Sequence, residues 1–148
     1  MALRASHIMR THLSFCSEVT PLRKLAEIMT ADPLGAVLVR HGEHSVGIVT
    51  ANDLLRSIAR GVDFETGKAA DIMSEPLVTC RCDDRLEEVL HRFEEAGCSR
   101  MVIVREGKAV GIIRRIVAEQ FLSQARLHEF SNETRRLPFR RGSGSATS

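Results

Sequence analysis

Hydrophobic positions in the N-terminal half alternate between helical and strand-like spacing. A stripe at helical spacing follows Thr20-Pro21, a typical helix start, and ends at Asp32-Pro33; its members are Leu22, Leu25, Ala26 and Met29. Two short apolar runs at 36–39 and 46–49 then flank His41-Gly42 and predict two strands joined by a hairpin. A second helix is predicted over residues 51–60, where Gly61 ends it and its apolar positions are Leu54, Leu55 and Ile58.

The same order of elements recurs later, because the sequence matches itself without gaps when it is shifted by 64 residues. Ile8-Met9 corresponds to Ile72-Met73, and Val46-Gly47-Ile48 corresponds to Val110-Gly111-Ile112. A repeat of this length indicates two duplicated units packed about a pseudo-twofold axis. We expect function to reside where the two copies differ.

Each copy is predicted to fold as strand–helix–strand–strand–helix, which places the chain in the mixed α/β (α+β) class. Short leading strands are expected near 13–15 and 77–79. The last helix, at about 115–130, is expected to turn four apolar side chains inward: Val117, Phe121, Leu122 and Ala125. We assign the first unit to residues 6–61, a linker to 62–69, the second unit to 70–130, and a disordered polar tail to 131–148.

Composition narrows the functional classes. The 148 residues are 43% hydrophobic, which suits one compact domain or two small halves that share a core. The formal net charge of +2 predicts no general attraction to nucleic acid or anionic membranes. Neither a membrane-spanning apolar run of about 18 residues nor a secretory signal is visible, so we expect a cytoplasmic protein.

The four cysteines are Cys16, Cys80, Cys82 and Cys98. Cys80 and Cys82 lie two apart, which on a strand puts them on one face in poor geometry for a disulfide. A second pair of ligands for structural zinc is missing from the sequence. Reduced, mostly packed thiols are therefore expected, and a metal or redox sensor built on Cys80 and Cys82 ranks last among the functional hypotheses.

The most specific motif runs from Val46 to Asp53, where a predicted strand passes directly into a helix at Thr50. Thr50 and Asp53 have the spacing of a capping box, in which each side chain satisfies the other residue's backbone N–H. The same groups also suit a phosphate-bearing ligand, because a helix N-terminus offers free N–H donors and a fixed carboxylate accepts hydrogen bonds from ribose hydroxyls. Both interpretations stay open at this point.

The duplicated unit, with Ile-Met before each leading strand and Gly-Ile-Val-Thr-x-x-Asp between strand and helix, resembles a CBS domain pair, the cystathionine-β-synthase or Bateman module. The resemblance covers about residues 6–127. It implies a regulatory, non-catalytic module that binds AMP, ADP or ATP in a cleft between its units, with S-adenosylmethionine less favoured. It also implies a homodimer that associates through its helices and signals to a regulated protein.

The resemblance further implies site residues. Thr50 and Asp53 would contact the ribose, together with the adjoining Ile48, Val49 and Asn52. Leu77 and Val78 would line the base, Arg100 would meet phosphate, and Arg114 or Arg115 would add a further positive charge.

The second copy departs from this pattern. Arg114 stands at the position of the threonine and Val117 at that of the aspartate, while the counterpart of Arg100 is Ala36. We therefore expect one nucleotide per chain. Sequence motifs of common enzyme classes, such as GxGxxG, HExxH and GxSxG, are missing. The main alternative is a ligand-free dimeric scaffold in which Thr50 and Asp53 only cap a helix.

Overall fold

A computed structural model describes residues 2–136, with side chains described through residue 129. The first unit contains β1 (Phe15–Ser17), α2 (Leu22–Ala31), β2 (Ala36–His41), β3 (His44–Thr50) and α3 (Ala51–Ala59). The second contains β4 (Thr79–Arg81), α5 (Leu86–Ala96), β5 (Arg100–Arg105), β6 (Lys108–Arg114) and α6 (Arg115–Arg136). Each unit holds a three-stranded sheet whose first two strands are parallel and whose last two form an antiparallel hairpin. The predicted fold class is confirmed.

Three details differ from the sequence prediction. The leading strands begin at Phe15 and Thr79, two residues later than expected, because Leu13 and Leu77 instead pack into the cluster between the units. Helix α6 extends to Arg136, past the predicted end at 130. Residues 131–136 include neither Gly nor Pro, so nothing in that segment stops the helix. The rest of the predicted disordered tail, 137–148, lies outside the described residues.

Helix α6 also buries a different residue from those expected. Ala118 is fully buried, whereas Phe121 is 37% exposed and Val117 is only partly covered. Helix α6 packs mainly against α5, so only a narrow strip of its surface is covered. On α3, Leu54 is buried but Leu55 and Ile58 face solvent.

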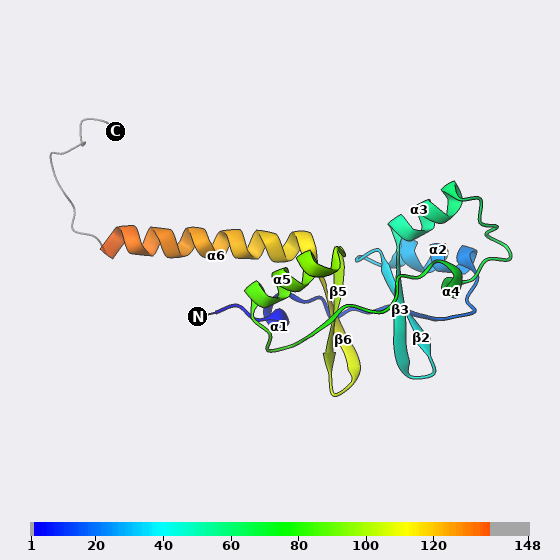
Figure 1. Ribbon diagram of the computed structural model, residues 1–148, viewed down its shortest axis with the longest axis horizontal. Helices are drawn as coiled ribbons and strands as arrows, with labels where there is room; N and C mark the ends of the chain where they lie inside the picture. The colour runs from blue at the N-terminus through cyan, green and yellow to red at the C-terminus, as the bar shows by residue number, and fades with distance from the viewer. Residues whose placement is uncertain (1, 137–148) are drawn as a thin grey trace.

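Two short helices precede the leading strands, α1 (Ala5–Ile8) and α4 (Ala69–Ile72), and they are exchanged between the units. Ala5 and Ile8 of α1 are buried in the core of the second unit. Ala69 and Ile72 of α4 are buried in the core of the first. Figure 1 shows α1 beside α5 and α4 beside α2. The sequence repeat and the packed unit therefore do not coincide at residues 5–10 and 69–74.

The exchanged segments are held by backbone pairing. Arg10 and Ile112 exchange hydrogen bonds of 2.8 and 2.9 Å, and Ser74 and Ile48 exchange bonds of 2.8 and 3.1 Å. The pairing brings Met73 against Gly47, where an added Cβ would lie 2.6 Å from the methionine sulfur. A side chain at position 47 would force Met73 to shift, so glycine fits this close approach best.

The two sheets meet in a shared apolar cluster, whose buried members are Leu34, Ala36, Leu38, Ile48, Val102 and Ile112. This cluster joins the units into one body and leaves clefts at its margins. Within residues 2–136, no helix is long and apolar enough to cross a bilayer.

Candidate functional site

A cleft of about 600 Å³ opens where α3 of the first unit faces the start of β5 and α6 in the second. We call it the interunit cleft. The segment 74–78, which leads from α4 into β4, forms one of its walls. Its lining side chains of interest come from both units and include Ile48, Thr50, Asn52, Asp53, Arg56, Ser74, Val78, Ser99, Arg100 and Arg115.

Asp53 is the most constrained polar residue of the cleft, with 5% of its surface exposed. Its Oδ2 accepts hydrogen bonds from the Thr50 N–H at 2.8 Å and from the Thr50 hydroxyl at 3.1 Å. Its Oδ1 accepts from Arg56 at 2.7 Å and, more distantly, from the Ser74 hydroxyl at 3.4 Å. Both carboxylate oxygens are thus engaged, and the bond to the Thr50 N–H completes the helix cap predicted from the spacing.

Positive charge gathers on the opposite wall. Arg100 and Arg114 stand directly across the β5–β6 pair from each other, and the Nε atoms of both are buried without a hydrogen-bond partner. Burial, and then the charge of Arg114, lower the pKa of Arg100, while Asp53 acts in the opposite direction. The terminal nitrogens of Arg100 donate hydrogen bonds to the Leu34 carbonyl at 3.2 Å and to the Ser99 hydroxyl at 3.3 Å. An anion in the cleft would relieve this repulsion between guanidinium groups.

The CBS domain sequence model matches residues 5–60 and 69–116, more than half of the chain. The chain belongs to the CBS domain family. The two matched segments correspond to the two halves of the observed pair, as the repeat predicted.

Three curated relatives match this CBS pair. It is 28% identical to a homoserine O-acetyltransferase of Methanococcus vannielii over 72% of this chain and 22% of that protein. It is 32% identical to the uncharacterised protein MK0525 of Methanopyrus kandleri over 52% of this chain and 40% of that protein. Identity to the uncharacterised protein YlbB of Bacillus subtilis is 30%, over 72% of this chain and 73% of that protein. The chain therefore spans less than half the length of the first two relatives.

Solved structures share the architecture. A conserved CBS-domain protein of unknown function from Thermoplasma acidophilum has a TM-score of 0.75 at 20% identity, covering 94% of this chain and 80% of that chain. The CBS domain pair of protein MJ0100, solved in complex with 5′-methylthioadenosine and S-adenosyl-L-methionine, has a TM-score of 0.74 at 15% identity, covering 84% and 99%. At these identities the likeness shows the fold.

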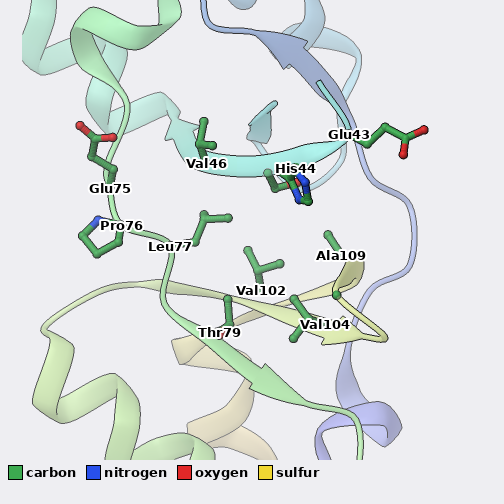
Figure 2. A pocket seen from close by; sticks show the side chains of 12 residues that line it. Glu43, His44, Val46, Glu75, Pro76, Leu77, Thr79, Val102, Val104 and Ala109 are labelled. Atoms are coloured by element: carbon green, nitrogen blue, oxygen red, sulfur yellow. The ribbon is translucent and has the colours of Figure 1, made fainter. Parts of the chain in front are cut away.

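Most of the site residues predicted from sequence meet in the interunit cleft of the CBS pair. Those that line it are Ile48, Thr50, Asn52, Asp53, Val78, Arg100 and Arg115. Val49 does not, because side chains alternate along β3 and Val49 points into the core of the first unit, where it is fully buried. Leu77 faces away from the cleft into a separate cavity, shown in Figure 2. Arg114 is not a lining residue and acts on the cleft through its neighbour Arg100.

Sequence reasoning missed Arg56, Ser74 and Ser99. Arg56 follows Asp53 by three residues, so it lies on the same face of α3, and this spacing is a signal that could have identified it. Ser74 comes from the exchanged segment, and its approach to Asp53 depends on the pairing with Ile48. No local pattern in the sequence encodes that contact.

The pseudo-symmetric cleft of the CBS pair differs in size and chemistry. It measures about 270 Å³ and is lined by Met9, Arg10, Thr11, His12, Pro33 and Leu34. Neither Arg114 nor Val117, the counterparts of Thr50 and Asp53, lines it. The two clefts therefore differ in volume and lining, while the expectation of one nucleotide per chain stays a prediction.

The cysteines lie apart from the interunit cleft except for Cys98, which lines it. All four are free thiols. Burial, reinforced by Asp84, raises the pKa of Cys80 to about 12, so its thiol stays protonated near neutral pH. Within the described residues, no cluster of three or more His, Cys, Asp or Glu side chains is placed to hold a metal ion.

Proposed function

We propose that this CBS pair is a regulatory module that binds one adenine nucleotide, AMP, ADP or ATP, in the interunit cleft and signals its occupancy to a partner protein. One observation carries the proposal. A carboxylate at a helix N-terminus and two arginines from the other unit, Arg100 and Arg115, face the same cleft. This pairs an acceptor for ribose hydroxyls with cations for phosphate.

The nucleotide must share Asp53 with its present partners. The Thr50 N–H holds Oδ2 in place, which leaves Oδ1 as the oxygen that a ribose hydroxyl can reach. Arg56 donates to that oxygen, but 66% of its side chain is exposed, so the guanidinium can swing away at little cost. The α3 N-terminus and Arg100 then face the phosphate.

The ligands of the MJ0100 pair support an adenosine moiety here, since they are adenosine derivatives held by the same fold. Among adenosine derivatives, the charge of this chain's cleft indicates which ones it binds. Arg100 and Arg115 line the cleft and favour an anionic ligand, whereas the sulfonium of S-adenosylmethionine adds a positive charge. Phosphorylated adenosines are therefore preferred.

We further propose a homodimer formed through the helices. Leu55 and Ile58 on α3 are 63% and 58% exposed, and Ile116 at the start of α6 is 57% exposed. Both helices leave the strand ends opposite the hairpins (Figure 1). A second copy covering these side chains would bury apolar surface and couple cleft closure to the partner chain.

A specific observation favours the alternative, a ligand-free scaffold. Both carboxylate oxygens of Asp53 already accept hydrogen bonds from residues of the same chain. The cap at the N-terminus of α3 alone explains the position of this side chain. The two functions differ in whether a nucleotide binds.

Calorimetric titration of the full chain with AMP, ADP, ATP, GTP, NADH and S-adenosylmethionine separates them. Thermal unfolding gives a second measurement. A ligand at 100 times its Kd adds about 2.7 kcal/mol to the free energy of unfolding, which raises the melting temperature by roughly 5–10 °C for a chain of this size. Asp53→Asn, which keeps the size of the side chain and one acceptor for Thr50, should abolish most of the binding. The matched control Cys82→Ser should leave it unchanged. Absence of binding and of a melting-temperature shift with all six ligands would favour the scaffold.

A further inference from the structure

The first long helices of the two units, α2 and α5, carry opposite charge although they are copies of each other. At equivalent positions in the first turn, α2 has Arg23-Lys24 and α5 has Glu87-Glu88. Towards the end of the same helices, Glu94-Glu95 stands where the first copy has Thr30-Ala31. All of these residues are exposed, while the buried stripe of each helix is apolar. The copies therefore share a face that packs in the core and differ in the charge of the face that does not.

The acidic helix α5 borders a groove of about 410 Å³ that lies between α5 and α6. We call it the α5–α6 groove. Its apolar lining is Leu90 and Leu122, and three carboxylates line it as well, those of Glu87, Glu94 and Glu119; the remaining lining residues are His91, Ser123 and Arg126. Among the side chains that the structure describes, Glu87 and Glu94 form no ion pair, and Glu119 pairs only with Arg115 of its own helix, at 3.6 Å. The groove thus combines an apolar lining with an excess of negative charge.

The first unit presents a ridge at the position equivalent to this groove. The repeat places Leu55 and Ile58 of α3 where Glu119 and Leu122 stand in the second copy. These two side chains are 63% and 58% exposed, and we call them the α3 ridge. Helix α2 packs against α3 and adds the exposed Arg23-Lys24. Arg23 pairs with the exposed Glu65, whereas Lys24 takes part in no ion pair within the described part of the chain.

We propose that two copies of this chain associate head to tail, so that the α3 ridge of each copy enters the α5–α6 groove of the other. The proposal rests on the homodimer proposed above and specifies its contact. Figure 1 shows both helix pairs on the side of the molecule away from the turns of the two hairpins. One twofold axis therefore produces two identical contacts, each of a ridge and its cations with an acidic groove.

A head-to-head dimer would lack this complementarity. It would bring groove against groove, with Glu87, Glu94 and Glu119 of both copies close together, and like charges at an interface oppose association. It would also set the exposed Leu55 and Ile58 of one copy against those of the other and leave both grooves unfilled. The charges and shapes of the two helix pairs therefore favour the head-to-tail arrangement.

The arrangement joins the interunit cleft of one chain to the second unit of the other. Asp53 lines the cleft at the start of α3, and Leu55 follows it by two residues on the same helix. A ligand that moves the start of α3 would therefore move the α3 ridge within the partner's groove. Occupancy in one chain would be felt by α5 and α6 of the other.

Charge exchange between the two surfaces tests the proposal. The first variant, Arg23→Glu with Lys24→Glu, makes both surfaces acidic, and the second, Glu87→Arg with Glu88→Lys, makes both basic. At low ionic strength, where surface charges are least screened, each variant alone should raise the dimer Kd about tenfold or more in sedimentation equilibrium. The four substitutions combined in one chain restore opposite charges at each contact and should return the Kd to within about threefold of the parent value.

A matched control carries the same change of charge elsewhere. Arg105→Glu with Lys108→Glu reverses two exposed cations on the hairpin of β5 and β6, away from the helices. It should leave the dimer Kd within about threefold of the parent value. Circular dichroism of every variant should match that of the parent, because all the altered side chains are exposed.

Head-to-head pairing predicts that neither the first nor the second variant weakens the dimer, since like charges already face each other in the parent. A parent dimer whose Kd is insensitive to both variants would therefore overturn the head-to-tail proposal and leave the homodimer standing. Failure of the combined chain to regain the parent Kd would also overturn it. If the combined chain does not fold, an equal mixture of the first and second variants replaces it, and this mixture should dimerise as the parent does. A parent chain that remains monomeric would instead remove the homodimer itself.

Discussion

Replacement of Arg56 by alanine tests how the interunit cleft exposes its carboxylate. Arg56 donates to Asp53 Oδ1 at 2.7 Å, and that oxygen is the one that the proposed ribose contact would use. Since 66% of the Arg56 side chain is exposed, solvent screens the ion pair, and its contribution is about 0.2–1 kcal/mol. A ligand that takes Oδ1 must give up this amount.

For adenosine, which has no phosphate, Arg56→Ala should therefore increase affinity by roughly 1.4- to 5-fold. For AMP, the released guanidinium lines the same cleft and is available to the phosphate, so its removal offsets the gain or reverses it. The ratio of the adenosine Kd to the AMP Kd should fall in the variant. Isothermal titration of both ligands at the same ionic strength measures this ratio.

Arg60→Ala is the matched control, because Arg60 caps the far end of α3 and does not line the cleft. It should leave both dissociation constants unchanged. A loss of adenosine affinity in Arg56→Ala would refute the reasoning, since it would mean that Arg56 orients Asp53 for the ribose instead of competing with it.

Three further outcomes are expected. Gly47→Ala should destabilise the chain by about 1–3 kcal/mol because its methyl group would collide with Met73 of the exchanged segment; an unchanged melting temperature would contradict that packing. Cys80, whose pKa is raised to about 12 by burial, should resist iodoacetamide at pH 8 until the chain is unfolded, and mass spectrometry showing rapid labelling of the native protein would argue against it. Leu55→Asp should convert the proposed dimer to a monomer in light scattering, whereas Val19→Asp, at an equally exposed site outside α3, should not.

Much of this protein follows from local sequence. The 64-residue repeat, the order of strands and helices, and the position of Thr50 and Asp53 at a helix start are all properties of short segments and their spacing. Helical and strand periodicities are set by backbone geometry, so they are visible in one chain without knowledge of its fold. The difference between the two copies at positions 53 and 117 likewise predicted one nucleotide per chain, which stays a prediction.

Long-range packing decided which faces of the elements are buried and which unit each short helix joins. In an extended segment, neighbouring side chains point to opposite sides of the backbone. Only the tertiary position of β3 and of the segment 74–78 therefore shows that Val49 lies in the core and that Leu77 faces the cavity shown in Figure 2. The exchange of α1 and α4 also lies beyond local pattern, since either unit offers an equivalent apolar surface to an Ile-containing helix. This exchange brings the Ser74 hydroxyl to Asp53 and places the segment 74–78 in the wall of the interunit cleft. Local periodicity specifies the elements, whereas contacts between residues far apart in sequence select which faces meet.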